Sequence, residues 1–153
     1  MKVLLDTSTL IAAMLPDHVH HAPSFAWLEQ AKAGAFEFFA SGHSVAEVYA
    51  VLTRLTRTPR ITPTDAARLL QENLVSCATI ATLSGHEYLA LIEELSHRGV
   101  IGGVVYDAVI AKVAELSAVD RLVTLNLEHF QKVWPAGAGR IISPLSVAPE
   151  TLS

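Results

Sequence analysis

This chain has only one cysteine, and it lacks long apolar runs and a recognisable export signal. Its single cysteine, Cys77, among 153 residues excludes an internal disulfide framework and a thiolate zinc site, and it fits a reducing compartment. No uninterrupted apolar stretch approaches the roughly 18 residues needed to cross a bilayer. The apolar run after Lys2 stops at Asp6, which indicates a core strand and not a signal peptide. We therefore expect a cytoplasmic protein with no membrane contact.

Several enzyme signatures are missing as well. The chain has no glycine-rich phosphate loop of the Walker kind, and no dinucleotide fingerprint follows its first strand. A Ser-His-Asp hydrolase would need a nucleophile elbow, which is absent. A phosphatase of the haloacid dehalogenase type would need an acid two positions after Asp6, where Ser8 stands. These absences argue against each of those reaction classes.

Positive charge is also in short supply. With 11 Lys and Arg residues the net charge is −4 at pH 7, which argues against a protein that coats nucleic acid by bulk electrostatics. In contrast, 51% of the residues are hydrophobic and only 17% are charged, and the mean hydropathy of +0.38 is high for a soluble monomer. We expect part of the apolar surface to be covered by a partner.

Apolar strands alternate with helical patterns, and nothing marks a domain boundary, so we expect one domain over residues 1–153. The alternation predicts an α/β fold, a three-layer α/β/α sandwich whose central parallel sheet has four to five strands. The expected strands are residues 3–5, 36–40, 79–82, 121–125 and 140–142. The expected helices are residues 8–14, 23–33, about 44 to before Pro59, 63 onward, 86–97, 104–116 and 127–133.

Three lone carboxylates interrupt otherwise apolar runs: Asp6 in MKVLLDTSTLIAA, Glu47 in SVAEVYAVL and Asp107 in VVYDAVIAKVAEL. An ionised carboxylate is costly to bury unless it is paired, hydrogen-bonded or bound to a cation. No Lys or Arg lies near Asp6 or Glu47 in those runs. Parallel sheets place their ligands at the carboxyl ends of the strands, where Asp6 and Asn126 should lie. We therefore predict that the three acids meet around a metal ion.

Each acid also has a plainer interpretation. Asp6 could simply cap the helix that follows it, and Asp107 could interact favourably with a helix dipole. Glu47 could pair with Arg54 or face solvent. We favour metal binding for all three, because Thr7 or Ser8 could cap the first helix equally well and because the surroundings of the acids are apolar.

The predicted ligands are oxygens. Hard oxygen ligands favour magnesium or manganese over zinc, so we expect Mg²⁺, with Mn²⁺ able to substitute. A bound ion can lower the pKa of its water and polarise a phosphodiester. The backbone amides after Asp6, with the hydroxyls of Thr7 and Ser8, could meet a phosphate oxygen.

Four segments taken together resemble the PIN-domain ribonucleases: LLDTSTLIA, HSVAEVYAVLTR, VVYDAVIAKVAE and RLVTLNLEHF. Within that family the chain is similar to the VapC-type toxins of bacterial toxin–antitoxin pairs. The resemblance covers nearly the whole chain, in the right order and at ordinary spacings. It implies a metal-dependent endoribonuclease that cuts structured or single-stranded RNA and leaves a 5′-phosphate and a 3′-hydroxyl.

The resemblance also implies roles for individual residues. Asp6 and Asp107 match the usual metal ligands, and Glu47 matches the second acid, which completes the cluster and helps to orient the metal-bound water. Thr124 and Asn126 match the closing segment of the site. Many members carry an acid at the position of Asn126, so its neutral side chain implies one tightly held ion and not two.

Basic and histidine side chains are candidates for substrate contact. Arg54 and Arg57 could bind RNA, although cations also favour helix C-termini, and the sequence leaves both interpretations open. His43 and His129 flank the acidic segments and could touch RNA, but we favour local capping. For the cluster of His18, His20 and His21, the loop position favours capping or solvent contact over metal binding.

The resemblance implies a homodimer that is held inactive by a cognate antitoxin. The antitoxin's C-terminal segment would lie in an apolar groove and insert a basic side chain at the acidic site. The alternative is a PIN-like RNA- or protein-binding module with a degenerate, non-catalytic acidic site, an interpretation that Asn126 keeps open. We expect the partner surfaces to include Leu10, Ile11, Met14, Phe25, Trp27, Val48 and Leu52.

Overall fold

A computed structural model of the chain describes residues 1–152, and its strands form one parallel sheet. The strand order is β3-β2-β1-β4-β5, with every neighbouring pair parallel. This confirms the predicted parallel sheet, and each strand falls on an expected segment. The strands are β1 (Lys2–Leu5), β2 (Glu37–Ser41), β3 (Thr79–Ala81), β4 (Arg121–Val123) and β5 (Ile141–Ile142).

Every expected helix is present, with bounds that shift by one or two residues. The α-helices are α1 (Thr7–Met14), α2 (His21–Lys32), α3 (Gly42–Arg54), α4 (Pro63–Leu70), α5 (Gly85–His97), α6 (Val104–Leu116) and α7 (Leu127–Val133). The sequence did not predict a π-helical turn, η1 (Gln71–Val75), or the two 3₁₀ turns η2 (Pro135–Arg140) and η3 (Pro149–Leu152).

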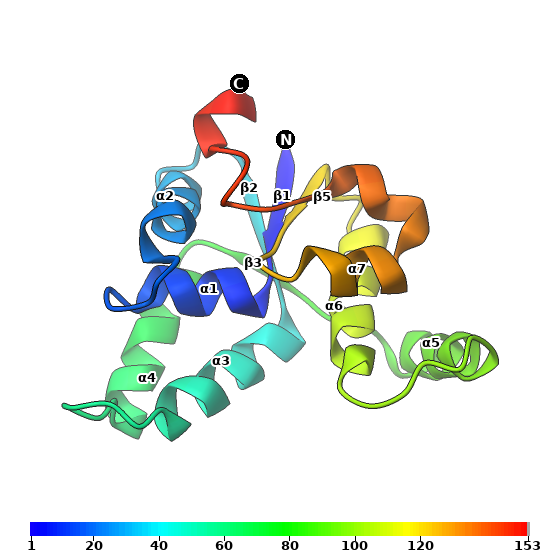
Figure 1. Ribbon diagram of the computed structural model, residues 1–153, viewed down its shortest axis with the longest axis horizontal. Helices are drawn as coiled ribbons and strands as arrows, with labels where there is room; N and C mark the ends of the chain where they lie inside the picture. The colour runs from blue at the N-terminus through cyan, green and yellow to red at the C-terminus, as the bar shows by residue number, and fades with distance from the viewer. Residues whose placement is uncertain (153) are drawn as a thin grey trace.

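The helices cover both faces of the sheet, so the three-layer prediction is confirmed (Figure 1). Side chains alternate between faces along a strand, and β1 shows the consequence. Val3 and Leu5 pack into a core with α1 to α4, whereas Leu4 packs into a second core with α5, α6 and α7. All three residues are fully buried. Within residues 1–152, no helix has the length and apolarity to cross a membrane.

Most of the residues predicted to lie on partner surfaces are core residues instead. Leu10, Trp27, Val48 and Leu52 have no exposed area, and Met14 is 7% exposed. Their helical stripes face the sheet, because burying that apolar area is what holds the helices onto it. This part of the partner prediction was wrong. The remaining two members of the set differ, since Ile11 is half-buried and Phe25 is exposed.

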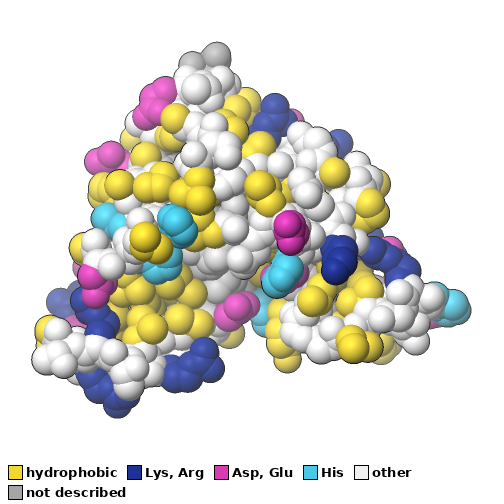
Figure 2. Space-filling view, viewed as in Figure 1, with side chains coloured by type: hydrophobic (Ala, Val, Ile, Leu, Met, Phe, Trp, Pro, Cys, Tyr) yellow, Lys and Arg dark blue, Asp and Glu magenta, His cyan; other side chains and the backbone are white. Residues whose placement is uncertain are grey.

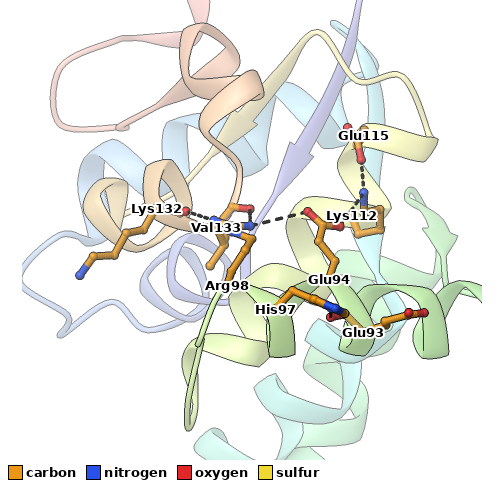
Figure 3. A network of polar contacts seen from close by, with 8 residues as sticks. All are labelled: Glu93, Glu94, His97, Arg98, Lys112, Glu115, Lys132 and Val133. Carbon is orange, nitrogen blue, oxygen red and sulfur yellow. Dashed lines mark hydrogen bonds and ion pairs between the residues drawn. The ribbon is translucent and has the colours of Figure 1, made fainter.

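The C-terminal end of α7 is held by a side chain from α5. Arg98, at the end of α5, donates hydrogen bonds to the carbonyl oxygens of Lys132 (2.6 Å) and Val133 (3.2 Å). Carbonyls in the last turn of a helix lack intrahelical donors. Figure 3 shows Arg98 reaching these carbonyls while it also pairs with Glu94, whose carboxylate faces Lys112. A cavity of about 320 Å³ adjoins this network, between α5, α6 and Trp134.

We expect Arg98→Ala to loosen α7, because two helix-end carbonyls lose their charged donor. The free energy of unfolding should fall by about 1 kcal/mol, because the Arg98 side chain is 33% exposed and solvent reduces the larger contribution of a charged donor. Urea unfolding followed by circular dichroism measures this difference. Arg60→Ala removes an exposed arginine and serves as the matched control. Equal losses in the two variants would show that Arg98 does not support α7.

Candidate active site at the carboxyl edge of the sheet

Asp6 lies at the carboxyl end of β1 and is the N-cap of α1. The residue is only 2% exposed. Its Oδ1 accepts hydrogen bonds from the Thr9 amide (2.9 Å) and the Ser8 hydroxyl (2.8 Å). Its Oδ2 accepts one from the Thr124 hydroxyl (2.8 Å), just after β4. Asp6 therefore does cap α1, as the plainer interpretation predicted. All of its hydrogen-bond donors are neutral, so among the described residues the buried carboxylate has no cationic partner.

Glu47 is linked to the Asp6 region by Thr7, the residue that follows Asp6 in the chain. The Thr7 hydroxyl lies 3.0 Å from Ser44 Oγ and 3.3 Å from Glu47 Oε2. Both Ser44 and Glu47 belong to α3, which begins where β2 ends. The Glu47 side chain is 39% exposed, and the His43 Nε2 atom one turn earlier lies 2.8 Å from its Oε2. Glu47 therefore pairs with His43 and not with Arg54.

Asp107 faces the same region from the first turn of α6. Its Oδ2 lies 3.2 Å from Nδ1 of His129 on α7. Partial burial raises the pKa of Asp107, the nearby His129 imidazole opposes that rise, and the charge of Glu47 adds to it. The electrostatic influence of Glu47 indicates that α3 and α6 present their acids to each other.

Burial is also the largest influence on the titration of Asp6. It raises the pKa of this carboxyl, and the hydrogen bonds from Thr9, Thr124 and Ser8 oppose it only in part. The fold thus holds this carboxyl in a place that disfavours its ionised form. Such a cost is typical of functional sites, where a substrate or ion supplies the missing interaction.

The donor chemistry of these acids fits a hard divalent cation, because their carboxylate oxygens are hard ligands and none is paired with Lys or Arg among the described residues. The described part of the chain holds no group of three or more His, Cys, Asp or Glu side chains close enough to bind a metal together. Magnesium commonly uses only one or two carboxylates, with water and substrate phosphate as its other ligands. The arrangement therefore fits an ion bound mainly by water and substrate.

The residues after β4 form the wall next to Asp6. The Leu125 amide donates to Ser8 Oγ (3.0 Å), and the Asn126 amide donates to Thr124 Oγ1 (2.9 Å). A hollow of about 410 Å³ is lined by residues 125–129. Asn126 is exposed at the start of α7 and its side chain makes no capping hydrogen bond. The side-chain amide of Asn126 is therefore free to face this hollow, as is the exposed carboxylate of Glu128, a residue that the sequence pattern did not single out.

The predicted substrate-binding hydroxyls are engaged within the site. Thr7 and Thr124 are buried, and Ser8 both donates to Asp6 and accepts from the Leu125 amide. Their contacts orient the acids, so direct contact with a phosphate stays a prediction. Local folding explains the arrangement, since Thr7 and Ser8 begin α1 directly after Asp6 caps it.

The two predicted arginines lie at the far end of α3. Arg54 is exposed in its last turn, and Arg57 is paired with Asp17 in the loop before α2, at 3.2 Å. Arg57 is thus already neutralised, while Arg54 keeps its charge available two helical turns beyond Glu47. Their contact with substrate stays a prediction.

The structure assigns the histidines more sharply than the sequence did. For His43 and His129 the favoured interpretation, local capping, was wrong, because each is paired with an acid of the site. The spacing of His43 and Glu47, four residues apart on one helix, was the available signal. In the loop before α2, His18 accepts from the His20 amide, and His21 contacts the Ala12 carbonyl. These contacts fit local capping.

The chain belongs to the PIN-domain family, whose model matches residues 3–133. Within the family it is similar to ribonuclease VapC27 of Mycobacterium tuberculosis, with 39% identity over 110 residues that cover 72% of this chain and 74% of the relative. It is also similar to ribonuclease VapC40 of the same organism, with 28% identity over 122 residues, 80% of this chain and 84% of the relative. The resemblance to VapC-type proteins is confirmed.

Solved structures share the fold. The VapBC2 complex of Rickettsia felis, bound to a promoter DNA fragment, matches with a TM-score of 0.62 and 20% identity, over 94% of this chain and 97% of that one. PAE2754 of Pyrobaculum aerophilum matches with a TM-score of 0.63 and 20% identity, over 95% and 91% of the two chains. FitAcB of Neisseria gonorrhoeae matches with a TM-score of 0.61 and 16% identity, over 95% and 99%. At these identities the likeness shows the fold alone.

The buried charge of Asp6 predicts a specific dependence of stability on pH. A carboxyl whose pKa is higher in the folded than in the unfolded state destabilises the fold at neutral pH, and this cost disappears as the pH falls towards the unfolded value, ordinarily 3.8. Asp6→Asn should therefore raise the free energy of unfolding at pH 7 more than at pH 4. Urea titrations with a metal chelator present measure both values.

Glu72→Gln is the control, because Glu72 is exposed and its substitution should change stability little at either pH. A gain from Asp6→Asn that does not shrink at pH 4 would contradict a raised pKa at this residue. A loss of stability in Asp6→Asn that is equal at pH 7 and pH 4 would contradict it as well.

Proposed function

We propose that the protein is a metal-dependent endoribonuclease, a toxin of the VapC type that a cognate antitoxin holds inactive. One observation carries the proposal: the buried Asp6 carboxylate lies at the carboxyl edge of the sheet without a cationic partner, and Glu47 and Asp107 face the same edge. Support comes from a relative with 39% identity that is a named ribonuclease. Hydrolysis of a phosphodiester would leave a 5′-phosphate and a 3′-hydroxyl.

In this proposal Asp6 and Asp107 would bind one Mg²⁺ ion, for which Mn²⁺ can substitute, with water and substrate phosphate as its remaining ligands. Glu47 would complete the acidic cluster by contacting the metal-bound water, since the described residues hold no group of three such side chains close enough to bind the ion together. When bound, such an ion lowers the pKa of its water and polarises the phosphodiester. Ser8 and Thr124 fix the orientation of Asp6 through their hydroxyls. The partly exposed Glu47 orients the attacking water and is itself held by the Thr7 hydroxyl. The neutral Asn126 side chain favours one ion over two.

We expect purified protein to cleave RNA in Mg²⁺ or Mn²⁺, and Asp6→Asn, Glu47→Gln and Asp107→Asn each to slow cleavage at least about a hundredfold, because each removes charge that the transition state needs. Incubation with total RNA, followed by mapping of the new ends, measures rate and chemistry. Glu72→Gln should cleave like the parent, and chelation should stop the reaction. Cleavage of equal rate by the parent and Asp6→Asn would overturn the proposal.

The second candidate is a non-catalytic RNA- or protein-binding module, which the neutral Asn126 at the edge of the site favours. Titration with Mn²⁺ by calorimetry separates the two functions. A nuclease should release heat on binding an ion and lose that heat in Asp107→Asn. A degenerate site should give no specific heat in either protein.

The antitoxin and homodimer proposals depend on exposed apolar area. Val19 in the loop before α2, Phe25 on α2 and Tyr49 on α3 are 84%, 42% and 39% exposed. Figure 2 shows hydrophobic side chains gathered over the side of the molecule formed by α1 to α4, with Lys and Arg side chains along its lower margin. Such an apolar area with a charged rim fits a partner chain. The solved neighbours include complexes of the VapBC and FitAB kind.

We expect the isolated chain to self-associate and to co-purify with a small protein encoded beside it. Phe25→Asp should weaken that co-purification, because it places a charge in the apolar area. Leu116→Asp, which alters an exposed residue at the end of α6, is the control. Analytical ultracentrifugation of the isolated chain is the second measurement. A freely soluble monomer at high concentration would count against a covered surface.

A further inference from the structure

An exposed pair of stacked rings lies between the acids of α3 and α6. Tyr106, in the first turn of α6, stacks on His43, in the first turn of α3, with ring centroids 4.8 Å apart and an angle of 13° between the planes. The Tyr106 residue is 55% exposed, whereas the His43 side chain is 22% exposed. His43 thus covers one face of the tyrosine ring, and solvent reaches much of the rest.

Both rings are tied to the proposed active site. His43 Nε2 lies 2.8 Å from the Glu47 carboxylate, and Tyr106 immediately precedes Asp107. The Asp107 side chain is in turn held 3.2 Å from His129. The stack is therefore fixed from two helices, at a place where a substrate bound to these acids would pass.

The geometry gives Tyr106 little structural reason to be aromatic. Among the contacts of residues 1–152, its hydroxyl has no hydrogen-bond partner and its ring stacks on His43 alone. Because the His43 and Tyr106 rings are nearly parallel, a third ring could stack on the outer face of Tyr106. Unpaired nucleobases are recognised in this way, by stacking on Tyr and His side chains.

Charge favours such a surface. The chain carries a net charge of −4, and the three acids add negative charge where the phosphate backbone would lie, so electrostatic attraction there is weak without a bound ion. Stacking does not depend on charge and tolerates any base, because every base has a flat π-face.

We propose that His43 and Tyr106 form a platform on which an unpaired base of the RNA substrate stacks beside the acids. The proposal rests on the ribonuclease function above and adds to it a requirement for a single-stranded nucleotide next to the cleaved bond. Tyr106 is then a binding residue that selects unpaired over double-helical RNA, in which each base is already stacked between its neighbours.

Binding of a short single-stranded RNA that carries one 2-aminopurine tests this proposal, since the emission of that base is quenched when it stacks. The experiment uses the full chain in an Asp6→Asn background, so that binding is read without cleavage. We expect quenching with this protein and with an added Tyr106→Phe. Tyr106→Leu should abolish the quenching and raise the dissociation constant by about fivefold or more. Tyr106→Trp should bind at least as tightly as the parent.

Leu89→Ala is the control, because Leu89 is also exposed, at 71% on α5, but takes no part in the stack, and it should leave quenching unchanged. A double-stranded RNA of the same sequence should give no quenching. Quenching and affinity that persist in Tyr106→Leu would overturn the platform, as would failure of the parent to bind single-stranded RNA. If the parent chain cleaves RNA but Tyr106→Leu leaves RNA binding unchanged, the platform proposal is wrong while the nuclease proposal stands.

Discussion

The Asp6 carboxylate is the point on which the arrangement of the site depends. Its backbone amide donates to the Val123 carbonyl at the end of β4, while its side chain caps α1 and accepts from Thr124. One residue thus joins two neighbouring strands and the first helix. The cost is a buried anion whose hydrogen bonds only partly offset its loss of hydration. A carboxyl group kept in this place at such a cost supports the proposal that an ion or a substrate binds at this edge of the sheet.

The choice of partners for the other two acids supports the same conclusion. Glu47 and Asp107 are each paired with a histidine and not with a lysine or arginine. A guanidinium presents a fork of several N–H donors that can engage both oxygens of a carboxylate, whereas an imidazole nitrogen donates a single hydrogen bond to one oxygen. The histidines therefore orient the acids from α3 and α7 while leaving them available.

The sequence predicted elements of the fold well because hydrophobic periodicity and helix-end residues are local signals. It also drew attention to Asp6, Glu47 and Asp107, since an acid in an apolar run is costly wherever the chain folds, and their joint role as metal ligands stays a prediction. It did not show which apolar residues face outward, and Leu10 and Trp27 proved to be core residues. The pairing of Arg57 with Asp17 and of His129 with Asp107 spans 40 and 22 residues. Such pairs are set by tertiary packing, which no local pattern encodes.

An acidic chain that acts on RNA faces an electrostatic contradiction, because its net charge of −4 repels the substrate. Basic side chains could resolve it only near the site, yet Arg54 lies two helical turns beyond Glu47 and Arg57 is already paired. A divalent ion would supply local positive charge at the acids without changing the rest of the surface. Stacking on Tyr106 would add affinity that salt does not screen. Together these two interactions would confine RNA binding to the carboxyl edge of the sheet, and non-specific binding elsewhere on the surface would stay weak.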